Sequence, residues 1–291
     1  MDKPKGKLIA IGGNEDKGTE SQPNFEQKNN LNFFALQILS RICHEMGGKN
    51  AKIEVITSAS SIPVEVGENY VDAFGKLGCT NVNVIDIRNR EDATNPKYIE
   101  RIKKCDGVMM TGGNQLRLST IFGGTEILEI LHHRYQNENF VIAGTSAGAM
   151  AMSNTMIYQG SSSGALIKGE VKITTGLALM GDVIIDSHFD KRGRFGRLAQ
   201  AVASNPSCIG IGLGEDTGVL LSEGHLLEII GSGLVMLFDG HQIRHNNIAD
   251  LQDGVPISIE NLIVHVLTKG NCYDLKSRKF FSELVKEGKP V

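Results

Sequence analysis

Ser146 lies in a segment whose residue types suit an enzymatic nucleophile. The motif Gly144-Thr145-Ser146-Ala147-Gly148 follows the apolar run Phe140–Ala143 and leads into further small residues. A strand, a tight GxSxG turn and a helix start form the nucleophile elbow of many hydrolases, where the serine backbone is strained and glycines allow close packing. The structural alternative is a close-packed turn around a buried, unreactive serine. The strand before the motif and the helix after it favour the elbow, so we predict that Ser146 is a nucleophile.

His188 and Glu215 are the residues expected to activate that serine. A serine hydroxyl needs a histidine base, which in turn is oriented by a carboxylate. Among eight histidines, His188 closely follows the apolar run 183–186, and Glu215 follows the run 208–211. A histidine at a strand end is often structural, but a chain that carries an elbow needs a base. The order Ser, His, Glu differs from that of α/β-hydrolases, where the acid precedes the histidine, and points away from ordinary esterases and lipases.

Two backbone amides are expected to stabilise the negative charge that forms on the substrate oxygen. The Ala147 amide lies beside the serine at a predicted helix N-terminus, where the positive end of the helix dipole also acts. The Gly112-Gly113 pair follows another predicted strand, and residues without a Cβ atom let backbone N–H groups approach a carbonyl. We therefore assign the oxyanion hole to Gly113 and Ala147.

These residues require a sheet whose strand ends meet at one edge. Short apolar runs rich in β-branched residues alternate with segments of helical spacing, such as Leu31–Met46, where Leu31, Phe34, Ile38 and Ile42 share a face, and Glu68–Leu77. This alternation predicts an α/β fold with a parallel sheet covered by helices, in which ligands bind beyond the carboxyl ends of the strands. The predicted strands are Lys7–Ile11, Ile53–Thr57, Val82–Ile87, Gly107–Thr111 and Phe140–Ala143.

The second half of the chain has more closely spaced strands. The runs Gly218–Leu221, His225–Ile230 and Val235–Phe238 predict an antiparallel meander with glycine-containing turns. The Gly/Ser-rich stretch 159–164 lies between active-site segments and is interpreted as a surface loop near the site. No linker separates the two halves, so residues 1–291 are expected to form a single domain.

Composition excludes several classes of function. With 41% hydrophobic and 22% charged residues, the chain is typical of a globular protein with a substantial core, and its net charge of −3 gives no general attraction to nucleic acid or acidic membranes. Five widely separated cysteines without CxxC spacing argue against a disulfide framework or a zinc finger and predict buried thiols. The charged start leads directly into a strand without a long apolar segment, so we expect a cytoplasmic protein.

Six motifs in one order resemble those of the cyanophycinases and, more distantly, of the related aspartyl dipeptidases. The resemblance covers nearly the whole chain. It implies a flavodoxin-like or class I glutamine amidotransferase-like sheet, mostly parallel, with flanking helices and a C-terminal antiparallel β extension. It also implies a Ser146-His188-Glu215 triad, exopeptidase activity without metal or cofactor, and a homodimer. The motifs are Gly12-Gly13-Asn14-Glu15-Asp16-Lys17, Thr111-Gly112-Gly113-Asn114-Gln115, Gly144-Thr145-Ser146-Ala147-Gly148-Ala149, Asp186-Ser187-His188-Phe189, Arg192-Gly193-Arg194-Phe195-Gly196-Arg197-Leu198 and Gly210-Ile211-Gly212-Leu213-Gly214-Glu215-Asp216.

The substrate implied by this resemblance is a polyaspartate backbone with arginine linked to each β-carboxyl, cleaved to β-aspartyl-arginine dipeptides. Such a ligand carries carboxylates and guanidinium groups. Arg194 and Arg197, three apart on a helix predicted to begin near Lys191, would form paired hydrogen bonds to a substrate carboxylate. A solvated basic helix or a phosphate site is the alternative. The residues expected to bind substrate are Gln115, Asp186, Ser187, Arg192, Arg194 and Arg197.

Two further observations bear on the substrate. Of the acidic residues that could receive a substrate guanidinium, Asp186 ranks first, ahead of Glu15 and Asp16, although any of them could instead cap a helix or hold a loop. The family commonly has glutamine where this chain has Ser187, which shortens a side chain expected to touch the substrate.

Three rival functions remain open. A dipeptidase or isoaspartyl peptidase would cleave short aspartyl peptides and ignore the polymer. A metal-binding or regulatory protein would use His241 and His245, four apart, although a turn or strand is expected there rather than a helix. A nucleotide or sugar sensor has little support, because neither GxGxxG nor GxxxxGK[ST] occurs in the chain.

Overall fold

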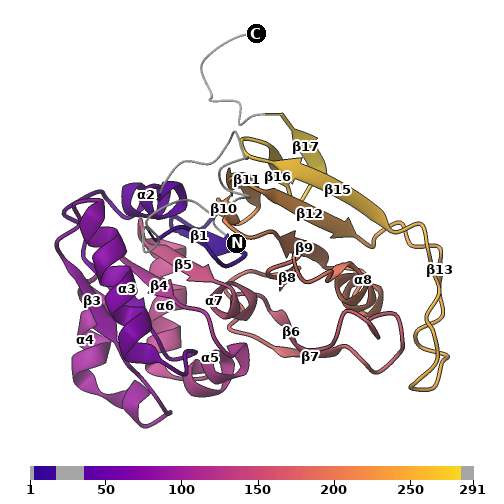
Figure 1. Cartoon of the computed structure of the whole chain (residues 1–291), viewed down its shortest axis with the longest axis horizontal. Helices are drawn as coiled ribbons and strands as arrows, with labels where there is room; N and C mark the ends of the chain where they lie inside the picture. Colours follow the sequence, from indigo (N-terminus) through magenta and orange to yellow (C-terminus); the bar gives the residue numbers. More distant parts are fainter. Residues whose placement is uncertain (1–2, 18–35, 283–291) are drawn as a thin grey trace.

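The protein has a mixed α/β fold built on two β-sheets (Figure 1). A computed structural model describes residues 3–17 and 36–282. One sheet has nine strands, and the other has four and lies beside it. Within the described residues, no helix combines the length and the apolar character needed to cross a membrane.

The five strands predicted in the first half form one continuous parallel half-sheet. Their order is β1-β5-β4-β2-β3, and each neighbouring pair is parallel. Residues of β1 alternate between two apolar clusters on opposite faces of the sheet, as the two-residue period of a strand requires. The prediction of a buried parallel sheet is therefore confirmed. The strand bounds are Lys7–Ile11 for β1, Ile53–Ile56 for β2, Val82–Ile85 for β3, Gly107–Met110 for β4 and Val141–Thr145 for β5.

Helices cover both faces of this half-sheet. Helices α2 and α3 pack on one face, and α4, α5, α6 and α7 pack on the other. Ile38 and Ile42 of α2 are buried as predicted, whereas Leu31 and Phe34 lie outside the described residues. The five cysteines are all buried, which also agrees with the sequence. The bounds are α2 Gln37–Glu45, α3 Pro63–Lys76, the short 3-10 helix η1 Asp92–Thr94, α4 Pro96–Lys104, α5 Gln115–Phe122, α6 Glu126–Asn137 and α7 Ala147–Ala151.

The predicted meander is correct for two strands and wrong for the third. Strands β10 (Thr217–Ser222) and β11 (Leu226–Gly231) pair antiparallel and extend the large sheet beyond β1. The next strand, β12 (Leu234–Asp239), instead joins the four-stranded sheet. The cause is local. The Ser232 amide donates to the Asp216 carbonyl and the Gly233 amide donates to Thr217 Oγ1. These bonds hold the turn after β11 against the start of β10, and the chain continues from there into the four-stranded sheet.

The four-stranded sheet has the order β15-β12-β9-β8 and carries the segments predicted to hold the base and the acid. Strand β8 (Val183–Asp186) ends two residues before His188, and parallel β9 (Ile209–Leu213) ends two residues before Glu215. Helix α8 (Phe195–Ser204) packs against both strands. The other strands are β15 Ile263–Thr268, β16 Cys272–Asp274 and β17 Lys279–Phe281, with the hairpin strands β6 Thr155–Gln159 and β7 Lys172–Thr175 and the short pair β13 His245–Asn246 and β14 Ile259–Glu260.

The glycines around Ser146 allow α7 to lie directly on the sheet. A Cβ atom at residue 148 would lie 2.3 Å from the Met110 carbonyl oxygen of β4, and one at residue 144 would lie 2.7 Å from the Gly148 backbone. Both distances are too short for any side chain. The tight approach predicted from the elbow motif is therefore present.

We expect Gly148→Ala to lower the free energy of unfolding by about 1–3 kcal/mol, because the added methyl group overpacks the contact with β4. The control is Gly75→Ala in α3, where a Cβ would meet nothing within 4 Å. That change should stabilise the protein by about 0.5–1 kcal/mol through helix propensity. Urea denaturation measures both, and equal effects of the two changes would contradict the close packing.

Candidate active site

Ser146 occupies the turn between β5 and α7 in a strained backbone conformation. Its φ is 50° and its ψ is −109°, outside the regions that non-glycine residues commonly adopt. The amide of Ser146 donates to the Ile11 carbonyl at 2.9 Å, and its carbonyl accepts from the Met150 amide at 3.0 Å. These two bonds hold the strained residue between β1 and α7.

Ser146, His188 and Glu215 form a chain of hydrogen bonds, with His188 in the middle. Ser146 Oγ is 3.0 Å from His188 Nε2, and His188 Nδ1 is 2.7 Å from Glu215 Oε1. A neutral imidazole protonated on Nδ1 would donate to the carboxylate and accept the serine proton at Nε2. The geometry is that of a nucleophile, a base and an orienting acid.

The Gly12-Gly13 turn after β1 positions both the histidine and the acid. The His188 amide donates to the Gly12 carbonyl at 2.8 Å, and the Asp216 amide donates to the Gly13 carbonyl at 2.9 Å. A Cβ at residue 13 would lie 2.4 Å from His188 Cε1, so only glycine leaves room for the imidazole. With a φ of 104°, Gly13 also has a backbone conformation that favours glycine.

Electrostatics around Glu215 keep its carboxylate ionised. Burial raises the pKa of Glu215, but hydrogen bonds from His188 and Asn14 outweigh it, so the net pKa lies below its usual value. An anion at neutral pH is the form that can accept the Nδ1 proton. Non-glycine residues with positive φ also gather at the triad, as expected where strain is held by the surrounding fold. They are Asn14, Ser146, His188 and Asp216.

Of the two predicted oxyanion residues, Ala147 directly follows Ser146, and Gly113 directly follows Gly112, which lies against the serine. A Cβ at Gly112 would be 3.4 Å from Ser146 Cβ, which places Gly112 against the serine. Gly113 has a φ of 138°, and a Cβ there would lie 2.1 Å from the Ala59 carbonyl oxygen. Ala147 directly follows Ser146 and starts α7, which has only five residues. A helix this short contributes its local amides rather than a long macrodipole.

The predicted roles of Asp186 and Arg197 in binding substrate do not fit the structure. Asp186 is fully buried, and Arg197 donates to both of its oxygens, with Nε at 2.6 Å from Oδ2. Arg194 Nη1 adds a third bond at 3.1 Å from Oδ1. The arginines thus bind an internal carboxylate, because the inner face of α8 packs directly on β8.

The other predicted substrate residues differ in exposure. Ser187 is buried, with Oγ 3.3 Å from Met150 Sδ, so it does not reach the surface. Gln115 is half-buried and donates to the Ile157 carbonyl at 2.9 Å. Burial lowers the pKa of Arg194 to about 10, although the charge of Asp186 raises it in part. The guanidinium therefore stays charged at neutral pH. Arg192 is exposed and precedes α8, which begins at Phe195 and not near Lys191 as predicted.

A buried network beside the nucleophile was not predicted from the sequence. Glu15 Oε2 accepts from Thr145 Oγ1 at 2.6 Å, its Oε1 accepts from Tyr70, and Lys17 Nζ lies 3.0 Å from Oε1. Burial raises the pKa of Glu15, but Lys17, Thr145 and Tyr70 together lower it below its usual value. Burial and the Glu15 charge raise the pKa of Tyr70 well above normal, so it stays a donor. Glu15 therefore supports the residue before Ser146 rather than meeting a ligand.

No metal centre is found among the described residues, where no three His, Cys, Asp or Glu side chains are placed to hold an ion. His241 lies in a turn with Nδ1 2.9 Å from Asp239 Oδ1, and His245 starts β13. The expectation of a turn or strand at this segment is confirmed.

Comparison with known proteins places this geometry in a family. The sequence model of the family described as "Peptidase family S51" matches residues 26–229, and this span includes Ser146, His188 and Glu215. The chain belongs to this family. This chain is 35% identical over 275 residues to a cyanophycinase of Synechococcus elongatus, and the match covers 94% of this chain and 81% of that one. It is 33% identical over 278 residues to a cyanophycinase of Geminocystis herdmanii, covering 96% and 97%.

A solved structure of a peptidase from an acI-B1 actinobacterium has the same general fold. Its TM-score is 0.64 at 20% identity, covering 92% of the S51 chain and 96% of that chain. At this identity the likeness concerns the fold alone.

We expect Glu15→Gln to destabilise the protein by about 2 kcal/mol at pH 7, because either the Thr145 or the Tyr70 hydroxyl loses its acceptor. The folded pKa of Glu15 is lowered, so its contribution is fully present above the unfolded value of 4.5 and is lost as pH falls through the folded pKa. The difference between wild type and variant should therefore shrink below pH 4.5.

Urea unfolding between pH 7 and pH 3 measures this difference. Glu129→Gln, at an exposed position of α6, is the control and should change stability by less than about 0.5 kcal/mol. A difference that stays constant across the whole pH range would show that Glu15 is not an ionised, hydrogen-bonded carboxylate.

Proposed function

We propose that this chain is a serine-type exopeptidase that degrades cyanophycin to β-aspartyl-arginine dipeptides. The observation that carries the proposal is the pair of hydrogen bonds that His188 makes. Its Nε2 lies 3.0 Å from Ser146 Oγ, and its Nδ1 lies 2.7 Å from Glu215 Oε1. The identity of 33–35% with curated cyanophycinases over more than nine-tenths of the chain supports the substrate.

The proposed reaction passes through an acyl-enzyme. Ser146 Oγ attacks the scissile aspartyl carbonyl while His188 Nε2 takes the hydroxyl proton, and Glu215 stabilises the imidazolium. The amides of Gly113 and Ala147 donate to the oxyanion. His188 then gives its proton to the leaving amine, and a water deprotonated by the same nitrogen hydrolyses the ester.

Substrate contacts are proposed for the predicted residues that reach the surface. Arg192 is exposed four residues after the catalytic histidine, and Arg194 and Gln115 are partly accessible. A cationic side chain at Arg192 suits the free carboxylates of the polymer. Asp186 and Arg197 are instead proposed to hold β8 and α8 together beneath the site.

Several wider features also belong to the proposal. The parallel half-sheet with helices on both faces supports a flavodoxin-like or class I glutamine amidotransferase-like arrangement, with β10, β11, β16 and β17 as its antiparallel C-terminal extension. We further propose that residues 1–291 form a single domain. We also propose that the protein is cytoplasmic and forms a homodimer.

We expect purified wild type to release β-aspartyl-arginine from insoluble cyanophycin, with or without a metal chelator. Ser146→Ala should lower the rate by about 10⁴–10⁶-fold, and Glu215→Gln by about 10⁴-fold, because the nucleophile or its oriented base is lost. Liquid chromatography of the soluble dipeptide measures the rate. Activity on short aspartyl or isoaspartyl peptides without release from the polymer would favour the dipeptidase alternative.

Arg192→Gln and Arg197→Gln should separate binding from folding. With a soluble β-aspartyl-arginine oligomer, Arg192→Gln should raise KM about tenfold at unchanged stability, since an exposed charge–carboxylate contact is lost. Arg197→Gln should lower the free energy of unfolding by about 3–5 kcal/mol, because it removes a partner from fully buried Asp186. Steady-state kinetics and thermal unfolding measure the two effects. The assignment is wrong if Arg192→Gln unfolds the protein or Arg197→Gln changes only KM.

A further inference from the structure

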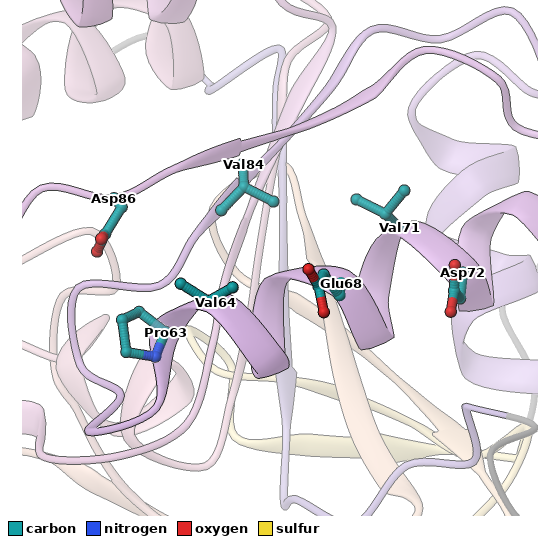
Figure 2. Close-up of a pocket in the computed structure, with 7 residues that line it drawn as sticks. All are labelled: Pro63, Val64, Glu68, Val71, Asp72, Val84 and Asp86. Atoms are coloured by element: carbon teal, nitrogen blue, oxygen red, sulfur yellow. The ribbon is translucent and has the colours of Figure 1, made fainter.

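A hollow of about 290 Å³ lies between α3 and the edge strand β3 (Figure 2), and no residue of the proposed triad lines it. Figure 2 shows Val64 and Val71 pointing from the helix toward Val84 of the strand, with carboxylates along the rim. The seven residues that line it, here called the edge groove, are Pro63, Val64, Glu68, Val71, Asp72, Val84 and Asp86.

The edge groove combines an apolar floor with negative charge. Val64 is 68% exposed, although it is a large apolar side chain next to the hollow. Glu68 and Asp72 are exposed carboxylates on the same helix, and none of the seven lining residues is cationic. Asp86 has a cationic neighbour in Arg88, at 3.3 Å. Arg88 also donates to the Thr57 and Ser60 carbonyls, so its charge is shared among several acceptors.

This combination selects the chemistry of the ligand. An apolar floor beneath carboxylates suits a side chain with an aliphatic stem and a cationic head, which places the stem on the valines and the charge on the rim. Arginine has this form, and its guanidinium pairs well with carboxylates. We propose that the edge groove binds arginine side chains of the cyanophycin polymer at a distance from the scissile bond. The inference rests on the proposed function.

The edge groove lies within reach of a chain bound at the triad. Gly113 lies against the Ala59 carbonyl, which also accepts from the Asn114 amide at 3.0 Å. Pro63, at the near end of the groove, follows Ala59 by four residues, which span at most about 14 Å. Cyanophycin has one arginine for each backbone aspartate, so about four repeats of an extended chain cover that span. One polymer molecule can therefore occupy both sites.

Two linked contacts should strengthen binding of the polymer but not of a short substrate. The second contact forms at the high effective concentration that the first contact creates. A soluble oligomer of two repeats is too short to benefit from it. The edge groove is therefore expected to matter for capture of polymer particles and to leave the chemical step unchanged.

The test compares a groove variant with a charge-matched control. The groove variant is Glu68→Gln/Asp72→Asn/Asp86→Asn. The control is Glu129→Gln/Asp250→Asn/Glu260→Gln, three exposed carboxylates outside the groove, so both variants raise the net charge by three. Each set is combined with Ser146→Ala for sedimentation with cyanophycin particles, and is kept with Ser146 for kinetics on the two-repeat oligomer. Thermal unfolding confirms that both variants fold.

We expect the groove variant to bind polymer particles about tenfold more weakly than the control, with kcat/KM on the oligomer unchanged. Equal particle binding by the two variants would overturn the proposal. So would loss of oligomer hydrolysis in the folded groove variant alone, because the carboxylates would then act at the triad. A change in oligomeric state with unchanged particle binding would identify the groove as a contact between two copies and would likewise overturn it.

Failure of the proposed function gives a different result. If wild type hydrolyses neither the polymer nor the oligomer, the function is wrong. Sedimentation of the Ser146→Ala proteins still decides whether the edge groove binds the arginine-bearing polymer, because that measurement needs no catalysis.

Discussion

The hydrogen bonds between the Gly12-Gly13 turn and the segments after β8 and β9 join the two sheets at the site. Ser146 follows β5 of the nine-stranded sheet, while His188 and Glu215 follow strands of the four-stranded sheet. The turn's two carbonyls accept the amides of His188 and Asp216, and its second glycine leaves space for the imidazole. The 3.0 Å contact between Oγ and Nε2 therefore depends on how the sheets dock.

Strain at the triad is held by this same set of backbone bonds. Ser146 and His188 both have positive φ, which costs about 1–3 kcal/mol for each such residue. The Ile11 carbonyl accepts the Ser146 amide, and the Gly12 carbonyl accepts the His188 amide. The consecutive carbonyls of Ile11 and Gly12 thus hold Ser146 and His188, while Glu15 accepts a hydrogen bond from the Thr145 hydroxyl.

Local signals in the sequence predicted the parts of the fold that depend on local chemistry. Short apolar runs rich in β-branched residues predicted the parallel strands, because buried strands carry apolar residues on both faces. The elbow motif predicted the turn at Ser146, and positions after strand ends predicted His188 and Glu215 as neighbours. All three side chains are brought together in the structure.

Contacts between distant segments were harder to predict. A basic helix face looks the same whether it binds a ligand or an internal carboxylate, so the pairing of Arg197 with Asp186 was misinterpreted. The Tyr70 hydroxyl reaches Glu15 from a helix with no sequence signal for that contact. β12 left the expected meander because side-chain and backbone acceptors at residues 216–217 bind the turn before it.

The division of the triad between two sheets also has a consequence during synthesis on the ribosome. The serine and its elbow emerge 42 residues before the histidine and 69 residues before the acid, as their positions at 146, 188 and 215 require. A nascent chain that ends between residues 146 and 188 carries the proposed nucleophile, Ser146, without its proposed base, His188. The proposed triad is therefore incomplete until β8 and β9 of the second sheet, and the residues that follow them, have been made and docked.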